Sequence, residues 1–165
     1  QLETDKVRYM VVGGLAMNLL GVPRSTMDVD LVLALDDTNL RHFLATARHL
    51  ALRPAAPVPL EDILSTEKRQ QWRNEKGVVA FALRPPQADA PTVDILINPP
   101  LDIDAALQRV EYRLVQGVRL PVISIRDLIA LKEQAGREQA QHGGLHRAGD
   151  VRDGYAAGRA GAEKG

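Results

Sequence analysis

Asp28 and Asp30 are two carboxylates separated by one residue in a stretch that is otherwise apolar. On a β-strand, residues two apart share one face and stand roughly 6.6 Å apart, so both carboxylates could flank a single divalent cation. Aspartate is disfavoured in strands, and two like charges on a buried face repel each other unless something positive lies between them. Hard oxygen ligands on a rigid strand suit Mg²⁺, which commonly shares its remaining positions with phosphate oxygens. The pair therefore indicates a magnesium site.

The spacing of these two aspartates is not specific by itself. Asp102 and Asp104 have the same spacing, but they follow Asn98-Pro-Pro and begin a predicted helix. Helix capping and the helix dipole account for carboxylates at that position. The surroundings of Asp28 and Asp30 must therefore distinguish the two pairs.

A glycine pair, Gly13-Gly14, lies between a predicted strand and a predicted helix ahead of Asp28. Such a turn offers unhindered backbone N–H groups beside a helix N-terminus, an arrangement that binds phosphate. A plain tight turn is the alternative, because the segment contains neither the dinucleotide-binding fingerprint nor the P-loop pattern. The glycine pair is a candidate phosphate site only in combination with the carboxylates.

Asp94 is a third carboxylate in an apolar strand, predicted at 92–97, whose residues Val93, Ile95 and Ile97 occupy the other face. Taken alone, Asp94 is expected on a half-buried strand whose polar side meets water. Its meaning depends on which residues the fold brings beside it.

The elements that must position these residues alternate between strands and helices. The pattern predicts strands at 9–12, 27–35, 78–83 and 92–97, with one or two more within 113–123. It predicts helices at 15–20, 39–50, 61–75, 102–110 and 124–134. We therefore expect an α/β (α+β) layer structure, with a mixed sheet of about four or five strands flanked by helices.

The composition is that of a single globular domain. The chain has 165 residues and a mass of 18.1 kDa, with 45% hydrophobic and 25% charged residues, so wholesale disorder is excluded. The formal net charge is zero, so an RNA partner would need a local basic patch. The absence of cysteine excludes disulfides and thiolate chemistry and suits a cytoplasmic protein. No apolar run is long enough to cross a bilayer, and neither a membrane nor DNA is expected as a partner.

Glycine is concentrated at the end of the chain, where eight of the thirteen glycines fall within 136–165. That segment has too few large aliphatic residues to build a core. We therefore expect a folded domain at 1–135 and a Gly/Ala-rich, flexible tail at 136–165. The first residue is Gln1 rather than Met, which indicates a processed or trimmed chain.

The segments 11–31 and 122–137 resemble the minimal nucleotidyltransferases of the DNA polymerase-beta superfamily, in particular its AbiEii-like abortive-infection group. The shared pattern is a Gly-Gly turn, Asp-x-Asp on a strand, a third acidic residue on another strand, and a late helix. The resemblance covers about residues 7–137 and is specific as a combination. It departs from Glu138 onward, where relatives continue with an acidic helix and this chain turns Gly- and Ala-rich. The resemblance implies a nucleotidyltransferase fold.

By this resemblance, Asp28, Asp30 and Asp94 are the catalytic and metal-binding residues. In the family, the paired aspartates hold Mg²⁺ against the triphosphate of an incoming nucleotide. The third aspartate helps to place a second ion, which lowers the pKa of the attacking hydroxyl. The resemblance therefore implies two Mg²⁺ ions as cofactors and an NTP as substrate.

The same resemblance implies five nucleotide-binding residues: Gly13, Gly14, Arg24, Thr26 and Lys132. The glycine backbone would cradle phosphate, Arg24 would neutralise it, and Thr26 would orient a ligand. Lys132 would reach the triphosphate or the base. The alternatives are a surface loop residue for Arg24 and a solvated helix residue for Lys132.

Two other groups of residues could bind ligands. A basic cluster surrounds Trp72 in the helix predicted at 61–75: Lys68, Arg69, Arg73 and Lys76. This cluster could contact an RNA or protein acceptor, although a solvated helix face is the stronger expectation. His142 and His146 have the four-residue spacing of a zinc helix, but they flank glycines and lack Glu or Cys partners.

We expect an enzyme that moves a nucleoside monophosphate from an NTP to a hydroxyl of RNA, protein or a small molecule. The resemblance also implies a toxin with an antitoxin partner. One alternative is a catalytically inactive nucleotide- or partner-binding module of the same fold. Another is a metal-dependent phosphoesterase that uses the same carboxylates. The sequence leaves the acceptor and the base of the NTP open.

Overall fold

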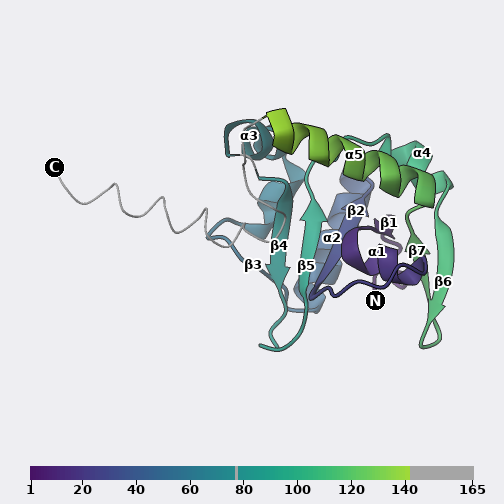
Figure 1. Ribbon diagram of the computed structural model, residues 1–165. Coiled ribbons are helices and arrows are strands. Elements are labelled where there is room, and N and C mark those ends of the chain that lie inside the picture. Colours follow the sequence, from purple (N-terminus) through teal and green to yellow (C-terminus); the bar gives the residue numbers. More distant parts are fainter. Residues whose placement is uncertain (77, 142–165) are drawn as a thin grey trace.

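A single mixed sheet organises the molecule. The structure, a computed structural model, describes residues 1–76 and 78–141. In that part of the chain, seven strands form one sheet in the order β3-β4-β5-β2-β1-β7-β6 (Figure 1). The strands are β1 (Tyr9–Val11), β2 (Asp28–Leu33), β3 (Arg53–Pro54), β4 (Ala80–Arg84), β5 (Thr92–Leu96), β6 (Glu111–Val115) and β7 (Val118–Val122). Central β2 is antiparallel to β1 and parallel to β5, so the expected mixed sheet is confirmed.

The described sheet is larger than the four or five strands expected. β3 has only two residues, which are too few for an alternating pattern to be recognised, and it pairs with β4. β6 and β7 form a hairpin because Gln116 and Gly117, both with positive φ, turn the chain. Two successive residues with positive φ make the kind of tight turn that matches strand twist.

Five α-helices and one 3₁₀ helix complete the described part of the chain. They are α1 (Gly13–Leu19), α2 (Asp37–His49), η1 (Leu60–Leu64), α3 (Thr66–Lys76), α4 (Ile103–Gln108) and α5 (Ile125–Gln141). In Figure 1, α5 runs along the sheet from the side of β6 and β7 toward α3. None of the described helices is long and apolar enough to cross a membrane.

Two boundaries differ from the expected ones. The helix expected at 61–75 is divided into η1 and α3 at Ser65, whose hydroxyl accepts a hydrogen bond from the Lys68 N–H at 3.1 Å and so begins the new helix. α5 continues to Gln141 instead of ending at Gln134, and it includes Gly136. The division into a domain at 1–135 and a flexible tail at 136–165 stays a prediction.

Aspartates cap two helices as expected. The carboxylate of Asp36 accepts a hydrogen bond from the Asn39 N–H at 2.9 Å at the start of α2. Asp102 accepts one from the Ala105 N–H at 3.1 Å at the start of α4. The second Asp-x-Asp pair of the sequence is therefore a helix start, and capping explains its first carboxylate.

The core lies around the two central strands. Met10 of β1 and Val32 of β2 are completely buried, and Leu40, Phe43 and Leu44 of α2 belong to the same apolar cluster. Burying a side chain of this size stabilises the folded state by about 1.5–3 kcal/mol. The strands that carry Asp28, Asp30 and the glycine turn are therefore the best-anchored part of the sheet.

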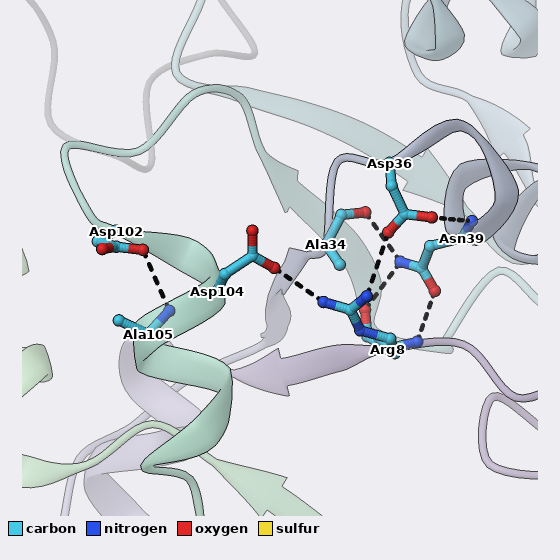
Figure 2. A network of polar contacts seen from close by, with 7 residues as sticks. All are labelled: Arg8, Ala34, Asp36, Asn39, Asp102, Asp104 and Ala105. Atoms are coloured by element: carbon cyan, nitrogen blue, oxygen red, sulfur yellow. Dashed lines mark hydrogen bonds and ion pairs between the residues drawn. The ribbon is translucent and has the colours of Figure 1, made fainter.

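Asn39 ties the chain before β1 to the start of α2 (Figure 2). Its amide accepts from the Arg8 N–H at 2.6 Å and donates to the Arg8 carbonyl at 2.9 Å and the Ala34 carbonyl at 2.8 Å. The Arg8 guanidinium contacts Asp36 and Asp104. Asn39 is 3% exposed, so these bonds satisfy backbone groups that water reaches poorly.

Within the basic cluster around Trp72, two side chains lie neither on a solvated face nor on an exposed acceptor surface, whereas Lys68 is exposed. Trp72 is buried and its ring stacks on Phe81 with centroids 5.3 Å apart. Arg69 is also buried, and it donates to the Ile63 carbonyl at 2.6 Å and the Leu64 carbonyl at 3.0 Å. A solvated face and an acceptor surface are therefore both wrong for Trp72 and Arg69. The guanidinium of Arg69 is buried because it caps the end of η1. His142 and His146 lie outside the described residues.

Candidate active site

The parallel pairing of β2 with β5 fixes the relative positions of the three aspartates. Asp30 is directly opposite Asp94, and Asp28 is opposite Thr92. Residues opposed on neighbouring strands share a face, and so do residues two apart on one strand. All three half-buried aspartates therefore project from one face of the sheet, on adjacent strands.

The glycine turn closes on this same face. Gly13 has a φ of +63°, and a Cβ there would overlap Oδ2 of Asp30 and lie 2.6 Å from its Cγ. A Cβ at Gly14 would lie 2.8 Å from Oγ1 of Thr26. The Val12 N–H donates to the Asp30 carbonyl at 2.9 Å and holds the turn against β2. The backbone approaches Asp30 of β2 at Gly13, and Thr26 just before β2 at Gly14, too closely for a Cβ at either position.

Asp30 is the electrostatically perturbed carboxylate of the three. Burial raises the pKa of Asp30 above its ordinary value, and the negative charge of Asp28 adds to the rise. A hydrogen bond from the Gly14 N–H and the positive charge of Arg24 act in the opposite direction. Because the net pKa shift is upward, these neighbours compensate the buried negative charge only in part.

The donors on this face fit magnesium by their chemistry. Carboxylate oxygens are the ligands that Mg²⁺ prefers in proteins, and the uncompensated charge of Asp30 would favour a cation. Within residues 1–76 and 78–141, no three acidic, histidine or cysteine side chains are gathered into a group that could hold a metal. The Asp30 carboxylate lies instead against Gly13 and Gly14. The backbone thus aligns the three carboxylates, and their side chains would have to converge to hold an ion.

Arg24 lies on the loop between α1 and β2, where its backbone and side chain are both held by α1. Its N–H donates to Oδ1 of Asn18 at 2.6 Å, and its carbonyl accepts from Nδ2 of Asn18 at 2.8 Å. Its Nη1 is 3.9 Å from the sulfur of Met17. Arg24 is exposed and close enough to Asp30 to lower the pKa of that carboxyl.

Lys132 reaches the same place from the far end of the sequence. Its Nζ lies 2.7 Å from the sulfur of Met17, on the helix that follows the glycine turn. Leu128, one turn before Lys132, and Leu131 are buried, whereas Lys132 itself is exposed. Two cationic groups therefore meet on one sulfur atom, and within the described chain neither forms an ion pair.

Thr26 has a local role that the structure shows directly. Its hydroxyl donates to the Asp28 carbonyl at 3.2 Å, and its side chain packs against Gly14. This contact joins the start of β2 to the glycine turn.

The structure thus brings Gly13, Gly14, Arg24, Thr26 and Lys132 to the region of the aspartates. Sequence reasoning missed Met17 and Asn18, which hold the two cations there. No motif marks a methionine or an asparagine near the end of a short helix, because their importance depends on contacts with residues that the helix itself does not contain.

Residues 2–153 match the family described as nucleotidyl transferase AbiEii toxin, type IV TA system. Among solved structures, the chain is similar to a crystal structure of a proposed nucleotidyltransferase from Thermotoga maritima. The two share 18% sequence identity and a TM-score of 0.51, over 86% of this chain and 82% of that one. At this identity the likeness shows the fold alone. None of the curated proteins matches this chain. Because the family match includes every described residue after the first, the chain belongs to the AbiEii nucleotidyltransferase toxin family, and it is an enzyme of the nucleotidyltransferase class.

Proposed function

We propose that this protein transfers a nucleoside monophosphate from an NTP to a hydroxyl acceptor in a magnesium-dependent reaction. The observation that carries the proposal is the register of β2 and β5, in which Asp30 is directly opposite Asp94. Three carboxylates from two distant segments of the chain thereby share one face beside a glycine turn. The family description supports the same reaction class.

Asp28, Asp30 and Asp94 would hold the metal, since they are the oxygen donors on this face. Bound Mg²⁺ would neutralise the triphosphate and lower the pKa of the attacking hydroxyl. Asp94, on the neighbouring strand, would face the acceptor as a ligand or as the base that takes its proton. The acceptor oxygen forms a bond to the α-phosphorus, the bond from that phosphorus to the bridging oxygen breaks, and pyrophosphate leaves.

The chain's own cations would bind the nucleotide. Arg24 and Lys132 converge on Met17, and two like charges placed this close together favour a polyanion between them. A triphosphate is such an anion. The side chains of Asp30 and Thr26 already occupy the places that a Cβ would take at Gly13 and Gly14, so phosphate oxygens would approach the turn through its backbone N–H groups.

As a member of a toxin family, the protein would act on a cellular target and be controlled by an antitoxin. RNA, a protein side chain and a small molecule are the candidate acceptors. Each offers a hydroxyl, and the choice among them depends on surfaces beyond the carboxylates.

The deciding experiment incubates the protein with each α-labelled NTP, Mg²⁺ and total cell lysate, followed by sizing of the labelled product. We expect label in one size class and its loss on chelation with EDTA. Asp94→Asn should lower the rate by about 100-fold or more, the scale on which electrostatic stabilisation of a transition state acts. Asp102→Asn is the matched control, because asparagine caps a helix as well as aspartate does and the rate should not change.

Three other outcomes would contradict the proposal in different ways. NTP binding without labelling of any acceptor would indicate an inactive binding module. Release of inorganic phosphate instead of pyrophosphate would indicate a phosphoesterase. An unchanged rate in Asp94→Asn would remove the assignment of that residue.

A further inference from the structure

The loop from 20 to 27 is exposed along most of its length, yet it carries Arg24 to the active site. Val22, Pro23, Arg24 and Ser25 are all exposed. The start of the loop is held by α1, through a bond of 2.9 Å from the Val22 N–H to the Met17 carbonyl. At Arg24 itself, the backbone N–H and the carbonyl both pair with the side-chain amide of Asn18.

The hydrogen-bonding groups of Asn18 suit it to hold the backbone of a single residue. An amide side chain has one oxygen that accepts and one nitrogen that donates, so it can pair with the N–H and the carbonyl of a single residue. The two bonds, at 2.6 and 2.8 Å, fix both the position and the direction of the Arg24 backbone. From there the guanidinium Nη1 lies 3.9 Å from the sulfur of Met17, the same sulfur that Nζ of Lys132 contacts.

The chain contains a second clamp of the same design for comparison. Asn39 pairs with the N–H and the carbonyl of Arg8 at 2.6 and 2.9 Å. Asn39 is buried, so its bonds satisfy groups that would otherwise lack a partner, which is a structural role. Asn18 is exposed, and water could replace both of its bonds at little cost in stability.

We infer that Asn18 is a positioning residue, which holds Arg24 in place for the triphosphate of the incoming NTP. The inference rests on the proposed function. An exposed clamp contributes little to the free energy of unfolding, whereas it removes conformational freedom from Arg24 before the nucleotide arrives. Asn18 acts through Arg24, whose backbone it holds.

The test is a double-mutant cycle of Asn18→Ala and Arg24→Ala, with KM for the NTP, kcat and the free energy of unfolding measured for each variant. We expect Asn18→Ala to raise KM by about tenfold, the order of the ordering cost of one long side chain, with kcat changed less. In the Arg24→Ala background, Asn18→Ala should have no further effect on KM.

Two matched variants separate positioning from stability. Asn39→Ala removes the buried clamp and should lower the free energy of unfolding more than Asn18→Ala does. Asn74→Ala, at an exposed position of α3, should change neither KM nor stability.

The outcomes distinguish this inference from the proposed function. Independent, multiplicative effects of the two substitutions on KM in an active enzyme would overturn the role of Asn18 alone. So would a loss of stability in Asn18→Ala as large as in Asn39→Ala. Absence of nucleotidyl transfer in the wild-type protein would overturn the proposed function, and this inference with it.

Discussion

Gly13 and Asp30 are in such close contact that no side chain fits at position 13. A Cβ there would overlap Oδ2 of Asp30 and lie 2.6 Å from its Cγ, and the backbone φ of +63° disfavours other residues as well. The glycine turn and the acidic strand are therefore one unit, in which the path of the backbone at the turn leaves room for the carboxylate.

This contact predicts that Gly13→Ala abolishes nucleotidyl transfer beyond what backbone strain explains. The strain of positive φ should cost about 1–2 kcal/mol of unfolding free energy, and the clash should also displace the Asp30 carboxylate. Gly117→Ala is the matched control, because Gly117 has a φ of +81° with nothing within 4 Å of an added Cβ. Urea unfolding should show a lowered free energy of unfolding in both variants, whereas the labelling assay should show lost activity in Gly13→Ala only. Equal activity in the two variants would contradict the importance of this contact.

The raised pKa of Asp30 predicts that the carboxylate costs stability at neutral pH. A group whose pKa is raised in the folded state favours folding when it is protonated, and that contribution is lost as the pH rises through the raised value. Asp30→Asn should therefore be more stable than the wild-type protein at pH 7. The difference should shrink as the pH falls through the raised pKa of Asp30, and become constant below the ordinary value of 3.8.

Thermal unfolding over a series of pH values measures the difference in stability between Asp30→Asn and the wild-type protein. Adding Mg²⁺ gives a second test of the same carboxylate. Addition of Mg²⁺ at pH 7 should raise the Tm of the wild-type protein and leave that of Asp30→Asn nearly unchanged, since a ligand stabilises the state that binds it. An Asp30→Asn protein that is less stable than the wild type at pH 7 would show that the carboxylate has a structural role instead.

The sequence predicts which chemical groups form the site better than it predicts how the fold brings these groups together. Asp28 and Asp30 can be placed on one face from local spacing alone, and the glycine turn from its residue types. The pairing of Asp30 with Asp94 depends on β5 lying beside β2, a relation between segments far apart in the chain, which periodicity does not encode. The family resemblance supplied that relation, and the ladder is consistent with it.

The errors also have physical causes. Lys68, Arg69 and Arg73 give the sequence of α3 a solvated character, whereas Arg69 is buried because its guanidinium finds backbone carbonyls as partners. Residue type predicts exposure only when polar atoms have no partner inside the fold. The contact of Asn18 with Arg24 could not be predicted either, because Arg24 lies outside the helix that contains Asn18.

The start of α5 gives a prediction about stability. Asp127 is 5% exposed and accepts hydrogen bonds from Arg109 at 2.8 and 3.1 Å and from Ser124 at 2.8 Å. The bond from Arg109, followed by that from Ser124, holds the pKa of Asp127 below its ordinary value against the effect of burial. The stability that this carboxylate contributes is therefore present at neutral pH and is lost as the pH falls through the lowered pKa.

Asp127→Ala should lower the unfolding free energy by about 2 kcal/mol at pH 7, because it removes these bonds and leaves Ser124 and Arg109 without their partner. Asp37→Ala is the control, since Asp37 forms an exposed ion pair with Arg41 within α2 and should matter little. Urea unfolding at pH 7 and at low pH compares the two variants. Equal effects at pH 7 would show that the Arg109–Asp127 pair does not anchor α5.

Lys132 supplies the last prediction, because α5 brings it to the sulfur of Met17 beside Arg24. If its ammonium binds the triphosphate, Lys132→Ala should raise KM for the NTP by about tenfold, the size of one charge-assisted hydrogen bond. Gln134→Ala, at an exposed position two residues further on, should leave KM unchanged. Because Lys132 is exposed, its loss should hardly alter the free energy of unfolding. A raised salt concentration should weaken NTP binding less in Lys132→Ala than in the wild type, since screening acts only on charges that are present. A KM that stays the same in Lys132→Ala would place the triphosphate elsewhere and leave Lys132 as a solvated helix residue.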